Sequence, residues 1–247
     1  MLLILGGTAE AKMLAKALHQ QGIDVIYSIA GLVRQPDLPC KVVSGGFSRF
    51  GGLADYVRDN QIVAILDASH PFAEKISQSA YAAASVNDIP LWRFSRPEWQ
   101  AVAGDRWSRF LTVANMQAHI RHYQSIFLTI GQLNQSWLTV LADLDCQVLL
   151  RTAVQPKCPL SSKIKWIQGI PPFSLEDEIN VMKQHHIDCL ISKNSGGDKA
   201  YAKLQAAREL GVDVLMLERP TLVQVDVEFN EPDACKSFII DALSELK

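Results

Sequence analysis

The 247-residue sequence predicts an α/β fold, because short apolar runs alternate with amphipathic segments along most of the chain. Residues 2–5 form an apolar run that ends at Gly6 and Gly7, and apolar residues at helical spacing follow as far as Leu18. Residues 63–66 are a second continuous apolar run, of the kind that is buried on both faces of a parallel sheet. Together these patterns predict doubly wound parallel sheets.

The elements follow in two series. In the first half we expect strands at residues 2–5, 23–29, 41–44 and 63–66, with helices from Ala11, from Leu53 and from Pro71 to Val86. Between Trp92 and Trp107 neither helical nor strand periodicity is sustained. The second series has strands at residues 126–130, 147–151, 165–168, 189–192 and 212–217, helices from Ser174 and Ala200, an alternating strand at 223–229 and a helix at 233–246. The sequence thus predicts two Rossmann-like domains, 1–97 and 98–247, with a cleft between them, the second including the C-terminal strand and helix.

Composition narrows the classes of function. The formal net charge is −2, which removes the electrostatic argument for nucleic-acid binding but is compatible with a local basic pocket. The five cysteines are scattered without Cys-x-x-Cys spacing, which argues for reduced thiols and against a zinc site. No apolar stretch approaches the length of a membrane span, and Met1 opens directly into a strand without a signal-peptide pattern. We therefore expect a cytoplasmic protein with no metal, no nucleic acid and no membrane partner; oligomeric state stays open.

Ligands of open parallel sheets bind beyond the carboxyl ends of the strands, and the first such loop is Gly6-Gly7-Thr8-Ala9-Glu10. Two glycines let the backbone pass close to phosphate oxygens, and Thr8 adds a hydroxyl donor. The loop departs from the G-x-G-x-x-G fingerprint, so by itself it is either a nucleotide loop or a plain tight turn.

Three further loops extend this candidate cofactor site. The second predicted strand ends at Ser28 without the carboxylate that binds the ribose of NADH, and Arg34 follows, so the sequence favours NADPH over NADH. Arg34 is either a phosphate ligand or a solvated loop charge. The third loop is Gly45-Gly46-Phe47, a close approach to the cofactor or a glycine turn. The fourth, residues 67–72, brings Ser69, His70 and Pro71 to a strand end, where a histidine is well placed to touch a ligand.

In the second half, the loop Lys193-Asn194-Ser195-Gly196-Gly197 joins a strand to a helix. It combines a cation, an amide, a hydroxyl and backbone N–H groups, which suits an anionic ligand. A structural turn needs the glycines but has little use for the three polar side chains together.

These motifs, taken in order, resemble the precorrin-6A reductase family. The N-terminal set is Ile4 to Thr8 with Glu10, Gly45 to Phe47, and Asp67 to Ala73; the C-terminal set is Pro172 to Ser174, Ser192 to Gly197, Lys203-Leu204, Ala206 to Arg208, and Arg219-Pro220. The resemblance spans nearly the whole chain. The sequence departs from the family at Ser69, where Thr is common, at Leu32, where Arg is common, and at Gln132, which is often basic.

The resemblance implies NADPH-dependent hydride transfer to a ring double bond of precorrin-6A, or of its cobalt form, to give the 6B form in cobalamin biosynthesis. NADH stays possible. Such a corrin precursor carries several carboxylates, and the candidate substrate-binding residues are Thr129, Gly131, Arg151, Lys193, Asn194, Ser195, Gly196 and Gly197. Candidate proton donors are Lys193, His70 and Tyr201. The alternatives are an NAD(P)-dependent reductase of another substrate and a non-catalytic nucleotide-sensing module.

Overall fold

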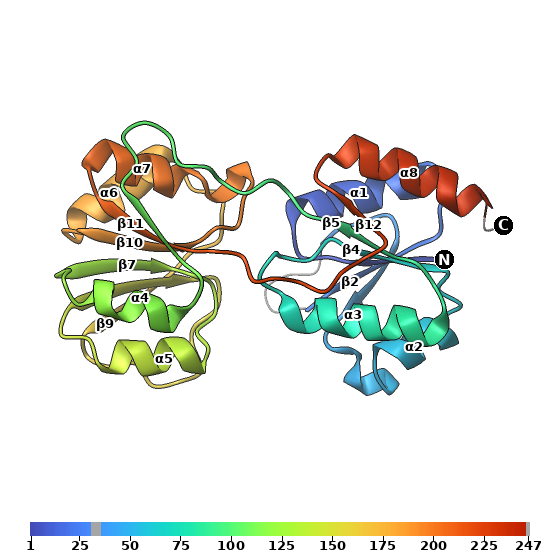
Figure 1. The fold of residues 1–247 in the computed structure, drawn as a ribbon, viewed down its shortest axis with the longest axis horizontal. Helices are drawn as coiled ribbons and strands as arrows, with labels where there is room; N and C mark the ends of the chain where they lie inside the picture. The colour runs from blue at the N-terminus through green and yellow to red at the C-terminus, as the bar shows by residue number, and fades with distance from the viewer. Residues whose placement is uncertain (31–35, 246–247) are drawn as a thin grey trace. The chain divides into compact units, whose positions relative to one another are not determined.

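The computed structural model describes residues 1–30 and 36–245. The chain forms two compact units, one made of Met1–Pro97 with Pro220–Lys247 and the other of Glu98–Arg219. Each contains one six-stranded parallel sheet between helices, so the predicted fold class is confirmed (Figure 1).

The sheet of the first unit has the strand order β12-β5-β4-β1-β2-β3, and every pairing is parallel. In chain order its strands are β1 (Leu2–Leu5), β2 (Val25–Ile29), β3 (Lys41–Ser44), β4 (Ala64–Asp67), β5 (Leu91–Phe94) and β12 (Val227–Phe229). The central strands β1 and β4 are buried along their whole length. This explains why they appear in the sequence as unbroken apolar runs rather than as alternating ones.

Helices cover both faces of this sheet (Figure 1). One face carries α1 (Ala9–Gln20) and α8 (Pro232–Glu245), and the other carries α2 (Leu53–Asp59) and α3 (Glu74–Asn87), with a short 3-10 turn at Phe47–Phe50 before α2. Thr8 starts α1 as its N-cap, since its side chain accepts the Ala11 N–H. The α3 helix begins at Glu74, later than the expected start at Pro71.

The second unit repeats the design with the strand order β6-β11-β10-β7-β8-β9, again all parallel. Its strands are β6 (Trp107–Phe110), β7 (Ser125–Thr129), β8 (Gln147–Thr152), β9 (Ile164–Gln168), β10 (Cys189–Lys193) and β11 (Asp213–Leu217). Its helices are α4 (Val113–Ile120) and α5 (Gln135–Ala142) on one face, and α6 (Leu175–Gln184) and α7 (Ala202–Leu210) on the other, with a 3-10 turn at Asp198–Ala200 (Figure 1).

The structure corrects two expectations about how the chain is divided. The stretch after Trp92 was expected to be patternless, but it contains β5, which is short and buried on both faces and so shows no period. The C-terminal strand and helix were assigned to the second domain, yet β12 pairs with β5 and α8 packs beside α1. Residues 220–247 therefore belong to the first unit. None of the described helices is long and apolar enough to cross a membrane.

Candidate active site

A cavity of about 580 Å³ opens at the carboxyl ends of β1 to β4 in the first unit. This is the end of a parallel sheet at which α/β proteins bind their ligands. The predicted cofactor residues that line it are Gly6, Gly7, Ser28, Gly45, Gly46, Phe47, Ser69 and His70. The four loops identified in the sequence, which are spread over residues 6–72, therefore meet in one place.

The other predicted cofactor residues have different surroundings. The Thr8 hydroxyl accepts the Ala11 N–H at 3.1 Å and donates to the Ala68 carbonyl at 3.0 Å, so it ties the first loop to the fourth. The Glu10 carboxylate pairs with Arg96 at 3.2 Å. Pro71 is buried and is not among the residues that line the cavity. Arg34 lies outside the described residues.

The fourth loop is organised by Asp67, the last residue of β4, which is 2% exposed. One carboxylate oxygen accepts the Ser69 N–H at 3.2 Å and the Ser69 hydroxyl at 2.6 Å. The other accepts the Ser77 hydroxyl at 2.5 Å and lies 3.7 Å from Arg93 Nε. Both carboxylate oxygens of Asp67 are thus engaged by neighbouring residues of the first unit. Asp67 therefore positions Ser69 at the cavity and does not act as a ligand itself.

His70 lines the cavity in a defined orientation. The Phe72 N–H donates to His70 Nδ1 at 3.2 Å. An Nδ1 that accepts a hydrogen bond carries no proton, so the neutral ring holds its proton on Nε2. In this arrangement the His70 ring is held beside Phe72 and lines the cavity. The geometry favours a ligand-orienting role for His70 over that of a proton donor.

No Asp or Glu is found among the described residues that line this cavity. Arg49 does not line this cavity but a neighbouring one beside β3; its Nη2 donates to the Ser44 carbonyl at 2.6 Å and its guanidinium lies over the Phe50 ring at 4.6 Å from the centroid. A Cβ placed on Gly45 would be 4.0 Å from Arg49 Nη1, so the guanidinium lies beside the third loop. Arg49 was missed in the sequence because a single exposed arginine carries no pattern.

In the second unit, the loop after β10 is fixed by hydrogen bonds to Trp99. Asn194 is fully buried; its side-chain oxygen accepts the Trp99 N–H at 2.9 Å, and its side-chain nitrogen donates to the Trp99 carbonyl at 3.3 Å. The Trp99 indole N–H donates to the Gly197 carbonyl at 3.0 Å. Asn194 was expected to bind substrate, but its side chain is buried and hydrogen-bonds to both backbone groups of Trp99, which favours a structural role in the loop.

Arg219 fixes the same loop from the end of β11. Its Nε donates to the Asn194 carbonyl at 3.0 Å and its Nη2 to the Ser195 carbonyl at 3.2 Å. With the carbonyls turned toward Arg219, the half-buried Lys193 and Ser195 stand at the carboxyl end of β10 with the two glycines following.

The structure also corrects the expectation for Arg151. Its two terminal nitrogens bind the two carboxylate oxygens of Glu178 at 3.0 and 2.7 Å. The guanidinium lies 4.7 Å from the Phe127 ring centroid and 3.8 Å from that of Phe173, and the residue is 9% exposed. Arg151 is therefore a buried ion-pair partner of the core and not a group that receives substrate carboxylates.

Thr129 and Gly131, the remaining predicted substrate residues, lie at the carboxyl end of β7. The Thr129 hydroxyl donates to the Ile191 carbonyl and accepts from Lys203 Nζ, both at 3.0 Å. Burial, with a smaller contribution from Arg151, lowers the pKa of Lys203 to about 7. Tyr201, a predicted proton donor, accepts from Arg208 at 2.8 Å in a network that includes Asp105.

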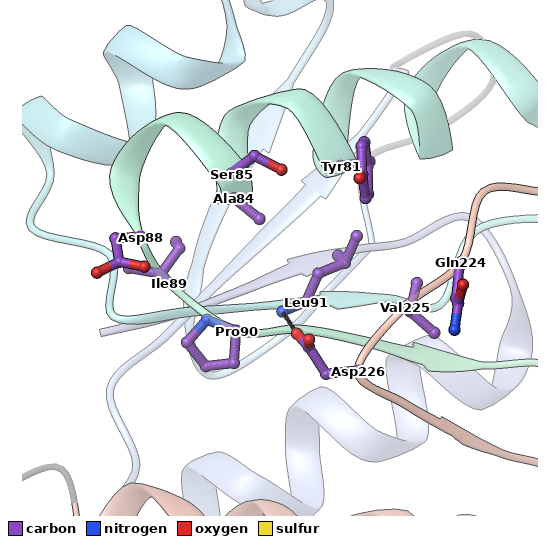
Figure 2. A pocket seen from close by; sticks show the side chains of 10 residues that line it. All are labelled: Tyr81, Ala84, Ser85, Asp88, Ile89, Pro90, Leu91, Gln224, Val225 and Asp226. Atoms are coloured by element: carbon purple, nitrogen blue, oxygen red, sulfur yellow. Dashed lines mark hydrogen bonds between the residues drawn. The ribbon is translucent and has the colours of Figure 1, made fainter.

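A larger cavity of about 650 Å³ lies elsewhere in the first unit, between the end of α3 and residues 224–226 (Figure 2). It lies at the amino end of β5, where Leu91 begins the strand. Asp226 accepts the Leu91 N–H at 2.7 Å there, as the dashed line in Figure 2 marks. This carboxylate anchors the returning C-terminal segment to the sheet. Among the described residues, no group of three or more His, Cys, Asp or Glu side chains could hold a metal ion.

The fold and the glycine-lined cavity define a doubly wound α/β protein of the Rossmann-like class, built to hold a ligand at the carboxyl ends of its strands. The family model described as "Precorrin-6x reductase CbiJ/CobK" matches residues 1–239, and the chain therefore belongs to this family of reductases.

Similar proteins agree with this assignment. The chain is 42% identical to the precorrin-6A reductase of Rhodococcus erythropolis over 90% of both chains. It is 31% identical to the cobalt-precorrin-6A reductase of Priestia megaterium, over 90% of this chain and 91% of that one. A solved structure titled "CobK precorrin-6A reductase" superposes with a TM-score of 0.87 at 32% identity, covering 97% of this chain and 96% of that one.

Proposed function

We propose that this protein is a precorrin-6A reductase of cobalamin biosynthesis that takes its reducing equivalents from NADPH. The observation that carries the proposal is the match to a reductase family over residues 1–239, combined with four glycine- and serine-bearing loops around one cavity. A purely nucleotide-sensing role has no comparable support, because the similar proteins named above are reductases.

The cavity in the first unit suits a nicotinamide dinucleotide. Gly6 and Gly7 lead into the amino end of α1, where backbone N–H groups and the helix dipole favour a pyrophosphate. Apolar side chains such as Leu5, Ile29 and Ile76 form the remaining wall. When bound, the reduced nicotinamide supplies a hydride, and the chain's own task is to orient it and to exclude water.

The preference for NADPH is supported by charge. Ser28 stands near the end of β2, where NADH-binding proteins carry an acidic residue for the ribose hydroxyls, and no described lining residue is acidic. A 2′-phosphate at this position would meet no carboxylate, and Arg49 lies beside the adjacent loop to attract it.

In the proposed reaction one hydride adds to a carbon of the substrate's conjugated ring system and one proton adds to the neighbouring carbon, so that the double bond is reduced and NADPH becomes NADP⁺. His70 lines the cavity and would help to orient the nucleotide there. Lys193 and the N–H groups of the following loop would receive carboxylates of the macrocycle.

The metal-free macrocycle is the substrate that the comparisons favour. Relatives named precorrin-6A reductase are 35–42% identical to this chain, whereas those named cobalt-precorrin-6A reductase are 26–31% identical. Anaerobic assay of purified protein with each macrocycle and NADPH tests the whole proposal. We expect faster oxidation of NADPH with the metal-free compound, and oxidation with neither compound would overturn the assignment.

A further inference from the structure

A buried tyrosine contacts the first glycine loop, and no motif in the sequence connects the two. Tyr27 belongs to β2 and is fully buried on the face of the sheet that packs against α1. Its hydroxyl accepts the Gly7 N–H at 2.9 Å. A Cβ on Gly6 would lie 2.1 Å from the Tyr27 Cζ and 2.3 Å from its hydroxyl oxygen, which is far inside van der Waals contact.

These contacts give the two glycines separate reasons to be glycine. Gly6 has no room for a side chain because the Tyr27 ring fills that space. Gly7 has open space around it but adopts a φ of 122°, a conformation that other residues rarely take. The tyrosine therefore sets both the position of Gly6 and the direction in which the Gly7 N–H points.

The same bond determines which donors a phosphate can use. The Gly7 N–H is engaged by Tyr27 and the Ala11 N–H by Thr8. The N–H groups of Ala9 and Glu10 lie in the first turn of α1, where helix geometry provides no intrahelical acceptor. The Glu10 carboxylate, which would repel an anion, is paired with Arg96.

On the basis of the proposed function, we propose that Tyr27 is a positioning residue of the nucleotide site: by engaging the Gly7 N–H it fixes the glycine turn so that the pyrophosphate is received by the N–H groups of Ala9 and Glu10. Tyr27 does not touch the reacting atoms. Burial raises the pKa of its hydroxyl, so the group stays neutral at working pH.

The test is Tyr27→Phe, which keeps the ring beside Gly6 and removes only the hydroxyl. We expect the Kd values of both NADPH and NADH, titrated without macrocycle, to rise by a similar factor of about two to ten, the effect of one hydrogen bond. The two cofactors should be affected alike because they share the pyrophosphate. The KM for the macrocycle should be unchanged.

Tyr56→Phe is the matched control. The Tyr56 hydroxyl is buried in the same unit without a hydrogen-bond partner among the described residues, so its removal should leave both Kd values unchanged. In a second variant, Gly6→Ala, the added methyl group occupies the space of the Tyr27 ring and should displace it from Gly7. If both variants act through the Gly7 bond, Gly6→Ala combined with Tyr27→Phe should weaken binding no more than Gly6→Ala alone.

The outcomes separate this inference from the proposed function. If wild-type protein binds neither nucleotide, the proposed function and the role of Tyr27 both fail. If the wild type binds and Tyr27→Phe binds equally well, with only a lower melting temperature, the tyrosine is merely structural and the inference is overturned. Tighter binding by Tyr27→Phe would also overturn it, because the phosphate would then be using the released Gly7 N–H.

Discussion

Lys203 on α7 offers a test of the buried charge in the second unit. It is 5% exposed, its Nζ donates to the Thr129 hydroxyl at 3.0 Å, and it lies 5.7 Å from the Trp99 ring centroid. Burial is the main cause that lowers its pKa from 10.5 to about 7; Arg151 lowers it further, and Glu178 opposes the shift. The perturbation is Lys203→Met, which keeps the unbranched shape and removes the titrating amine.

Proton linkage determines whether the contribution of Lys203 to the free energy of unfolding rises or falls with pH. Between about pH 7 and 10.5 the unfolded chain holds a proton on Lys203 that the folded chain has lost, so this residue's contribution to stability rises with pH across that window. At about 1.4 kcal/mol per pKa unit, it destabilises the fold by roughly 4 kcal/mol at pH 7 and by roughly 2 kcal/mol at pH 9. Lys203→Met removes this destabilisation, but it also removes the hydrogen bond to Thr129, which costs about 1 kcal/mol of stability at either pH.

We therefore expect Lys203→Met to be more stable than wild type at pH 7. The difference between their free energies of unfolding should be about 2 kcal/mol smaller at pH 9. Urea unfolding followed by tryptophan fluorescence is the assay, because Trp99, Trp107, Trp137 and Trp166 all belong to this unit. The exposed Lys199 supplies the control Lys199→Met, whose difference in free energy of unfolding from wild type should not vary with pH. If the difference for Lys203→Met is also independent of pH, Lys203 does not have a lowered pKa in the folded protein.

Three further predictions concern single side chains. Arg49→Ala should raise the Kd of NADPH about tenfold and leave the Kd of NADH unchanged, as measured by parallel titration of the two cofactors; an equal loss of affinity for both would contradict this. Lys193→Ala should raise the KM for the macrocycle with little effect on the Kd of NADPH; a collapse of nucleotide affinity instead would mean that this loop does not serve the macrocycle. Glu178→Ala leaves the Arg151 guanidinium buried without its partner and should lower the free energy of unfolding by roughly 3–5 kcal/mol, measured by urea denaturation; a loss below 1 kcal/mol would show that Arg151 finds solvent.

Most of the fold could be predicted from the sequence because its signals are local. The apolar runs of β1 and β4, the glycine turns and the Ser174 cap of α6 with its partner Asp177 all occur within a few residues of one another. The assignment of β12 failed because strand partners are chosen by long-range pairing. Nothing local shows that Val227 pairs with Trp92 across more than a hundred residues of chain.

The candidate site was predicted as a set of loops, and the four loops of the first unit line one cavity in the structure. It could not be predicted residue by residue, because polar side chains look alike in sequence whether they meet a ligand or hold the backbone. Asn194 and Arg151 have the chemistry of substrate ligands but are buried against Trp99 and Glu178. Conversely, Tyr27 looks like an ordinary strand residue, and only its contact with Gly6 and Gly7 reveals a part in the site.

The central claim is that this chain reduces precorrin-6A with NADPH bound at the Gly6 side of the first unit. It is tested most directly by anaerobic turnover of the purified macrocycle, with NADPH oxidation and the mass of the product followed together. We expect one NADPH to be consumed for each macrocycle, which gains two hydrogen atoms, and we expect Tyr27→Phe to turn over about two to ten times more slowly at low NADPH and to recover at saturating NADPH. Oxidation of NADPH without a reduced macrocycle, or no oxidation with either form of the substrate, would contradict it.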